Sequence, residues 1–312
     1  MTSSNEFAPG LQGALRLHDW GLIIATGADS ASFLHGQLTQ DMLHLPDDRA
    51  RPAGYCSAKG RLMATFIAWM RGPQELALAC SADVLPATLK RLSMFVLRAK
   101  CKLTDAGGSL AIYGLAGEAA ARWLGDSGGA QPWSVVPRGV AQVIRLPDAQ
   151  GTARWLLVQP QVEPAPDLPP ISAEHWQWLE VVSGVPRITA ANVEQFVPQM
   201  VNLELTGGVN FQKGCYPGQE VVARSQYRGT LKRRMYRLAA DGPISAGDDV
   251  FHESDPDQPA GRVVLAAPAP TGGSEALVEF KSALFETPGD IRCGGASLRR
   301  LALPYVIPAE PA

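Results

Sequence analysis

The sequence predicts an α+β fold followed by an all-β unit, and three observations support this class. Candidate strands and amphipathic helices alternate along the first half of the chain. After about residue 231 the helical period is lost, and short candidate strands recur between Gly and Pro turns. At roughly 150 residues per domain, the 312 residues correspond to about two domains or three small ones.

The first helix is predicted after Asp29, a capping residue, with Leu34, Leu38 and Met42 on its apolar face. This spacing is typical of an amphipathic helix at the protein surface. The same reasoning predicts the elements that follow: strands over 62–70 and 75–80, a helix over 83–98, strands over 110–115, 140–146 and 155–158, and a short helix over 118–124.

A connection, a further helix and a barrel complete the predicted order. Five prolines between residues 160 and 170 predict an exposed connection. Ser172 is expected to cap a helix that turns Trp176, Leu179 and Val182 inward. The candidate strands nearer the C-terminus predict a small β-barrel or sandwich, and they cover 235–238, 249–253, 262–266, 276–280 and 298–303.

The composition argues against several classes of protein. Because 28 Lys and Arg nearly balance 30 Asp and Glu, the whole molecule is not a basic nucleic-acid coat. The longest apolar run, 62–70, is too short for a membrane span, and residues 1–10 lack the charges and apolar stretch of a targeting peptide. We therefore expect a cytoplasmic protein without membrane contact. Five scattered cysteines argue against a disulfide framework or a local cluster site.

Common catalytic motifs are weak or missing. Gly-Asp-Ser-Gly-Gly at 125–129 resembles the surroundings of a serine nucleophile. Such a nucleophile needs a buried strand before it and a helix after it, but here a short helix is predicted before it, so we interpret the segment as a plain loop. The five histidines form no i, i+4 pair, which argues against a mononuclear metal site. The sequence contains neither G-x-x-x-x-G-K-[ST] nor G-x-G-x-x-G, the two common glycine-rich motifs that bind phosphate groups. Their absence excludes the simplest nucleotide-binding interpretations.

Residues 213–220, Lys-Gly-Cys-Tyr-Pro-Gly-Gln-Glu, carry the strongest chemical signal. Pro217 suits the first position of a helix, so we expect a helix over 217–224. Cys215 then lies just before a helix N-terminus, where unpaired N–H groups and the charge of Lys213 favour the thiolate over the thiol. The alternative interpretation is a buried, inert cysteine in a turn.

Six cations follow within fourteen residues, at Arg224, Arg228, Lys232, Arg233, Arg234 and Arg237. Such a strip can hold carboxylates, phosphates or RNA. The alternative is a solvated strand edge, where Lys and Arg discourage pairing with another chain.

The octapeptide at 213–220 and the Val-Ala-Arg at 222–224 resemble the signature of the YgfZ family. This family is a folate-binding branch of the glycine cleavage T-protein (GcvT) superfamily. The octapeptide is highly specific, and the other matching segments are weaker. These segments are Phe33 to Asp41, Ala58 to Arg61, Pro198-Gln199 and Asn202-Leu203.

The resemblance implies a GcvT-like three-part fold. Two α+β portions of ferredoxin-like type, 1–105 and 106–230, would surround a central folate pocket, and 231–312 would form a C-terminal β-barrel; the first portion can be discontinuous. The implied ligand is tetrahydrofolate or a derivative, with no stably bound metal. The implied role is to make or repair iron–sulfur clusters in client proteins, including enzymes that thiolate tRNA, which gives an indirect link to tRNA.

The resemblance also implies a set of site residues. Cys215 takes the position of the family's essential cysteine, as an exposed nucleophile or a transient cluster ligand, with Lys213 beside it. The supporting signature residues are Gly214, Tyr216, Gly218, Gln219, Glu220 and Arg224. Asn202, Leu203 and Arg228 are candidate folate contacts, and Arg228 suits the glutamate tail.

Two departures from the T-protein pattern bear on the reaction. Met63 and Ala64 stand where T-proteins carry acidic residues, and Pro198-Gln199-Met200 replaces their Pro-x-Glu. Without these carboxylates, aminomethyl transfer is not expected. The leading hypothesis is therefore a folate-dependent accessory factor rather than a transferase. The alternatives are a one-carbon transferase or demethylase in which Cys215 is merely structural, and a tRNA-binding module that uses the strip over 224–237.

Overall fold

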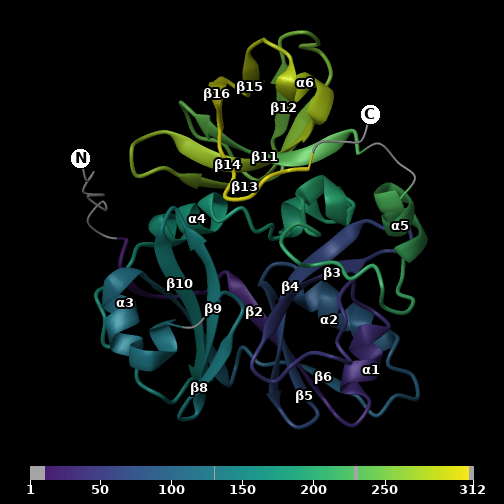
Figure 1. Ribbon diagram of the computed structural model, residues 1–312, viewed down its shortest axis with the longest axis vertical. Helices are drawn as coiled ribbons and strands as arrows, with labels where there is room; N and C mark the ends of the chain where they lie inside the picture. The colour runs from purple at the N-terminus through teal and green to yellow at the C-terminus, as the bar shows by residue number, and fades with distance from the viewer. Residues whose placement is uncertain (1–10, 130, 228–230, 309–312) are drawn as a thin grey trace.

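The computed structural model describes residues 11–129, 131–227 and 231–308, and every structural statement below refers to these ranges. It contains two five-stranded sheets and a closed six-stranded barrel, all with antiparallel neighbours (Figure 1). The predicted α+β class and the C-terminal barrel are confirmed. No described helix is both long and apolar enough to span a membrane.

The first sheet has the strand order β3-β4-β5-β2-β6. Alternate residues of its central strands enter two different cores: Phe66 faces a core shared with α1 and α2, and Ile67 faces a core shared with the second sheet. Both faces are therefore covered. The elements are β2 (Trp20–Thr26), α1 (Ser30–His35), β3 (Ala50–Cys56), β4 (Leu62–Gly72), β5 (Glu75–Ser81), α2 (Leu85–Met94) and β6 (Lys102–Asp105).

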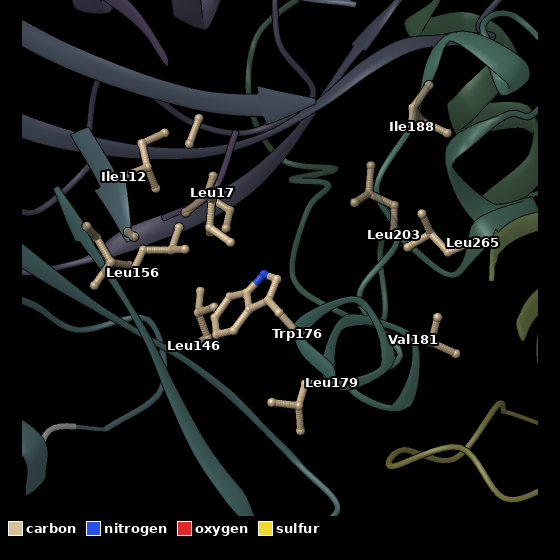
Figure 2. Close-up of a cluster of buried hydrophobic side chains, with 14 of the residues drawn as sticks. Leu17, Ile112, Leu146, Leu156, Trp176, Leu179, Val181, Ile188, Leu203 and Leu265 are labelled. Carbon is tan, nitrogen blue, oxygen red and sulfur yellow. The ribbon is translucent and has the colours of Figure 1, made fainter. Parts of the chain in front are cut away.

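The second sheet has the strand order β1-β7-β10-β9-β8, so residues 13–16 belong to it although they precede the first sheet. Its inner face meets α4, whose Trp176 lies beside Leu146 and Leu156 in the central core (Figure 2). The elements are β1 (Gly13–Arg16), β7 (Leu110–Ala116), α3 (Gly117–Leu124), the turn η1 (Gly125–Gly129), β8 (Val135–Arg138), β9 (Ala141–Ala149), β10 (Thr152–Pro160) and α4 (Ala173–Val182).

The barrel lies above the two sheets and rests on α4 (Figure 1). A connecting region with the short helical turns η2 (Ala190–Asn192) and η3 (Pro198–Val201), and then α5 (Gln219–Tyr227), leads into it. The barrel elements are β11 (Arg233–Ala240), β12 (Asp249–His252), β13 (Gly261–Pro268), β14 (Ser274–Lys281), α6 (Ser282–Glu286), β15 (Ile291–Cys293) and β16 (Ala296–Leu301).

One predicted helix cap is confirmed and another is wrong. The hydroxyl of Ser172 accepts a hydrogen bond from the His175 backbone N–H at 3.1 Å, at the start of α4. The Asp29 carboxylate does not cap α1, because it accepts a hydrogen bond from the Lys100 backbone N–H instead. Helix α1 ends at His35, so Leu38 and Met42 are buried in the loop that follows it and not on a helix.

Candidate functional site

The segment that carries the cysteine is bound to the segment after α1. We name residues 207–218 the cysteine loop and residues 33–41 the cradle. The Thr39 hydroxyl donates a hydrogen bond to the Gly208 carbonyl at 2.6 Å, and the Thr39 carbonyl accepts one from the Asn210 N–H at 2.9 Å. The Gln40 side chain donates to the Gly207 carbonyl at 2.6 Å. Two segments that are far apart in the sequence thus form one unit.

Lys213 fastens this unit at its centre. Its ammonium donates hydrogen bonds to the carbonyls of His35 and Leu38, where α1 ends and orphan carbonyls carry partial negative charge. The ammonium also lies 4.7 Å from the ring centroid of Tyr216. Burial lowers the pKa of Lys213 to about 8, although the nearby Asp41 and Cys215 act in the opposite direction. The amine therefore still carries its charge at neutral pH.

Gly218 closes the loop against a second turn of the first sheet. Its φ is +78°, and a methyl group placed on it would lie 2.4 Å from the Ser57 carbonyl oxygen and 2.6 Å from the Gly60 nitrogen. Only glycine fits there, because the two turns touch backbone to backbone. The segment 58–61, a weaker match to the family pattern, is thus in direct contact with the octapeptide.

The predicted start of the helix after Cys215 is wrong. Helix α5 begins at Gln219 instead of Pro217, because Gly218 has a left-handed conformation that a right-handed helix cannot include. Cys215 is therefore separated from the helix by three residues. The dipole of a helix acts mainly within its first turn, so Lys213 is the stronger source of positive charge at the thiol.

The five thiols differ in their access to solvent. Cys215 is exposed, Cys101 is half-buried, and the other three are buried. Burial raises the pKa of Cys56 and Cys80 to about 12 and that of Cys293 to about 11, and it also raises the pKa of Cys101. Cys215 is thus the most accessible thiol among the described residues.

A histidine and an aspartate of the cradle form a hydrogen-bonded pair. His35 Nδ1 lies 3.0 Å from Asp41 Oδ1, and His44 Nδ1 lies 2.8 Å from Asp41 Oδ2. Burial raises the pKa of Asp41, but hydrogen bonds from His44 and His35 outweigh this effect and bring it to about 2. The carboxylate is therefore ionised at neutral pH. The sequence pattern marked both His35 and Asp41 only as part of a matching segment and assigned them no role.

The remaining signature residues have structural contacts. Tyr216 is buried in the central core, which raises its pKa above the ordinary value. The Gln219 side chain donates a long hydrogen bond of 3.5 Å to the Lys213 carbonyl. Glu220 and Arg224 form an exposed i, i+4 pair at 2.7 Å, which adds little to stability. These residues therefore have structural contacts within the loop or at the start of α5.

The candidate folate contacts are not all available to a ligand. Asn202 is fully buried, and its side chain donates to the Met235 carbonyl at 2.7 Å, so it joins η3 to the barrel. Leu203 lines the central cavity described next. Arg228 lies outside the described residues. Met63 and Ala64 pack in the core between the first sheet and its helices, away from that cavity.

The central cavity lies between the two sheets and the C-terminal end of α4. Its polar lining includes Glu180, Arg187 and Arg154, and its aromatic lining includes Trp20 and Trp133. Both oxygens of Glu180 have partners, the indole N–H of Trp20 and the guanidinium of Arg187, each at 2.8 Å. The buried Arg187 Nε has no partner among the described residues.

This cavity suits a pterin by its chemistry but not by its present size. A carboxylate, guanidinium groups and aromatic faces are the groups that orient a polar aromatic ligand. The space inside is about 40 Å³, which holds about three waters at roughly 10–15 Å³ each. A folate therefore enters only if side chains of the lining move apart.

Three cations of the predicted basic strip are not free for an anion. Arg237 and Glu275 approach to 2.6 Å, and Arg233 and Arg234 pair with the buried Glu279 and Glu204. These pairs join barrel strands to one another and to the connecting region. The interpretation of the strip as an anion-binding surface is wrong for these three arginines, because each already pairs with a glutamate. The sequence did not reveal these pairs, since the glutamates lie far along the chain.

The chain is similar to known proteins in sequence and in fold. It is 33% identical to a tRNA-modifying protein YgfZ from Sodalis glossinidius over 253 residues, which covers 76% of this chain and 74% of the relative. It is 30% identical to a protein of the same name from Hamiltonella defensa over 307 residues, 93% of this chain and 89% of the relative. No protein-family model matches the chain.

Among solved structures, the glycine cleavage aminomethyltransferase T of Bartonella henselae has a TM-score of 0.72 with this chain. The identity is 16%, and the match covers 95% of this chain and 86% of the other. At this identity the likeness shows the fold. It confirms the expected GcvT-like arrangement of two α+β parts and a barrel.

We predict that Gly218→Ala destabilises the protein and that Gly214→Ala does not. A methyl on Gly218 clashes with the backbone of Ser57 and Gly60 and forces a left-handed conformation, which costs about 2 kcal/mol or more. A methyl on Gly214 meets only His35 Nε2, at an ordinary 3.4 Å. Urea denaturation measures both. Equal stability of the two variants would contradict the backbone contact.

We predict that iodoacetamide modifies Cys215 first in the native protein. Its exposure and the raised pKa of the other thiols give an expected rate at least about tenfold above that of Cys101 at pH 7. Mass spectrometry of the labelled peptides identifies the site. Faster labelling of Cys101 or Cys293 would show that the reactive thiol has been misidentified.

Lys213→Met is predicted to slow this labelling at pH 7, because the variant lacks the positive charge beside the thiol. The native pKa of Lys213 is lowered to about 8, so the amine loses its charge as the pH rises through that value. The difference in rate between wild type and variant is therefore expected to shrink above about pH 8. A difference that grows with pH would contradict this electrostatic role.

Proposed function

Because this chain belongs to the YgfZ family, whose relatives bear the name tRNA-modifying protein, we propose that it is an accessory factor for iron–sulfur proteins. Its clients include enzymes that thiolate tRNA. The reacting group is the Cys215 thiol, and tetrahydrofolate or a derivative is the ligand of the central cavity. The observation that carries this proposal is the single exposed thiol among the described cysteines, held in a loop that Lys213 fastens.

The form of the loop supports a chemical role for Cys215. A cysteine used only for packing is buried, as Cys56 and Cys80 are. Cys215 is exposed although its neighbours Lys213 and Tyr216 are buried. Hydrogen bonds, a buried cation and a contact that only glycine allows thus hold the loop in a form that exposes one sulfur to solvent. We take the thiolate to act as a nucleophile on a client.

The central cavity supports a folate as the ligand. Each oxygen of Glu180 accepts one hydrogen bond, from Trp20 or from Arg187, and keeps a second lone pair for the pterin edge. The unpartnered Arg187 Nε offers a donor. Arg154 adds a buried cation whose pKa burial lowers to about 10, so it is charged at neutral pH. Binding requires the lining to open, and we assign no chemical step to the folate.

One-carbon transfer is not favoured by the groups present. Met63 carries a thioether and Ala64 a methyl, and neither accepts a proton. Glu180, the acidic residue among the cavity's described lining, is held by Trp20 and Arg187. A tRNA-binding module based on the strip is weakened in the same way, because three of its arginines are paired within the protein.

The decisive test compares Cys215→Ala with Cys101→Ala in cells that lack their own copy of this protein. Cys101 is half-buried, so the same substitution there controls for the loss of a sulfur. We expect wild type and Cys101→Ala to restore the activity of tRNA-thiolating iron–sulfur enzymes and Cys215→Ala to fail. Full restoration by Cys215→Ala would contradict the proposed role of the thiol.

A matched assay separates the accessory role from catalysis. Purified protein with tetrahydrofolate and an aminomethylated or N-methylated donor is expected to form no 5,10-methylenetetrahydrofolate above background. Multiple turnovers, unaffected by Cys215→Ala, would instead assign the protein to the one-carbon transferases.

Folate binding is tested by calorimetry with tetrahydrofolate. We predict binding by wild type and at least about tenfold weaker binding by Glu180→Gln, because a charged acceptor for the pterin is lost. Glu174→Gln is the control, since Glu174 lies on the same helix but is exposed. An absence of heat and of thermal stabilisation at millimolar tetrahydrofolate would remove folate from the account.

A further inference from the structure

The cradle presents a histidine that the proposed function has not used. The His35 and Asp41 side chains are only 15% and 14% exposed, and the 3.0 Å contact joins Nδ1 of the ring to a carboxylate oxygen. A carboxylate only accepts hydrogen bonds, so Nδ1 carries the proton in the neutral ring. The lone pair is then at Nε2. Among the described residues, no hydrogen-bond donor occupies this position.

Nε2 faces the cysteine loop. A methyl group placed on Gly214 would lie 3.4 Å from it, and the glycine has no side chain that separates the ring from the residue that follows. The Lys213 ammonium, on the residue two positions before Cys215, hydrogen-bonds to the carbonyl of the same His35. His35 thus lies against the two residues that precede Cys215, with its ring at Gly214 and its carbonyl at Lys213.

We propose that His35 is the base that takes the proton of the Cys215 thiol and that Asp41 is the positioning residue that orients its ring. The inference rests on the proposed role of Cys215 and deepens it. When the exposed side chain of Cys215 turns toward Nε2, the S–H proton moves to the Nε2 lone pair. A thiolate and an imidazolium form without any change in net charge. Asp41 stabilises the imidazolium, and Lys213 stabilises the thiolate.

Charged and titratable groups surround His35 and Cys215 on two sides. Asp41 and His44 lie on the Nδ1 side, and Arg51 donates a hydrogen bond to the Asp41 carbonyl at 2.9 Å. Lys213 lies on the side of the loop. His44 touches the same carboxylate as His35, but its side chain is 79% exposed, which makes it a natural control.

The test measures alkylation of Cys215 by iodoacetamide from pH 5 to 10 in the full chain, with peptide mass spectrometry as the readout. His35→Asn retains an amide that can donate to Asp41 but lacks the Nε2 base. It is expected to slow the reaction at least about tenfold at pH 7 and to move the inflection of the rate to higher pH. His44→Asn is expected to change neither. Equal profiles for wild type and folded His35→Asn overturn the proposal.

A second measurement keeps the test decisive if His35→Asn is unstable. The imidazole nitrogens of His35 are followed by NMR in wild type and in Cys215→Ser. A thiolate partner favours the imidazolium, so His35 is expected to take up its proton at higher pH in wild type. Identical titrations of His35 in the two proteins overturn the pairing. Neither readout uses iron–sulfur activity, so the pairing can fail while the cellular role of Cys215 stands, and the reverse is equally visible.

Discussion

The buried ammonium of Lys213 is the contact on which the site depends. It joins the end of α1 and the loop after it to the cysteine loop, and residues 36–41 and 207–218 contain none of the described helices or strands. A long flexible lysine normally stays in water, because burial of its charge is costly. Here the orphan carbonyls of His35 and Leu38 offset that cost. These hydrogen bonds from the ammonium, which we call the lysine cap, therefore hold the loop in place. The thiol lies two residues further along the chain.

This cap explains why the matching segments of the sequence belong together. The cradle supplies carbonyls and the His35–Asp41 pair, the turn at Gly60 supplies a backbone surface for Gly218, and the loop supplies the cation and the sulfur. None of these parts lies in the central cavity. The fold thus has two separate features, a small polar cavity between its sheets and an exposed thiol near the helices of the first sheet. In the proposed function the cavity binds the ligand and the thiol acts on the client.

Features that depend on local interactions could be predicted from the sequence, whereas features that depend on contacts between distant residues could not. Helix α4 could be predicted because its serine cap and apolar spacing are local. Strand β3 gave no alternating pattern, since both faces of the first sheet are buried. The start of α5 was mispredicted because a contact with Ser57 and Gly60, distant in the sequence, fixes the conformation of Gly218. The same holds for the arginines of the strip, whose glutamate partners lie far along the chain.

The exposure of Cys215 agrees with the expectation from the sequence, but the groups around it could not be predicted. Lys213 is two residues from the thiol in the sequence, yet its carbonyl partners belong to a different segment. His35 and Asp41 come together because the chain turns back at the end of α1, and no periodic pattern marks such a turn.

Hydrogen exchange of the backbone in Lys213→Met tests the capping role of the ammonium most directly. Methionine keeps the length of the side chain but cannot donate to the carbonyls of His35 and Leu38. The account predicts faster exchange over residues 33–41 and 207–218, with the barrel and the second sheet unchanged. Unchanged protection of both segments in the variant would show that the loop is held without the ammonium and would contradict the central claim.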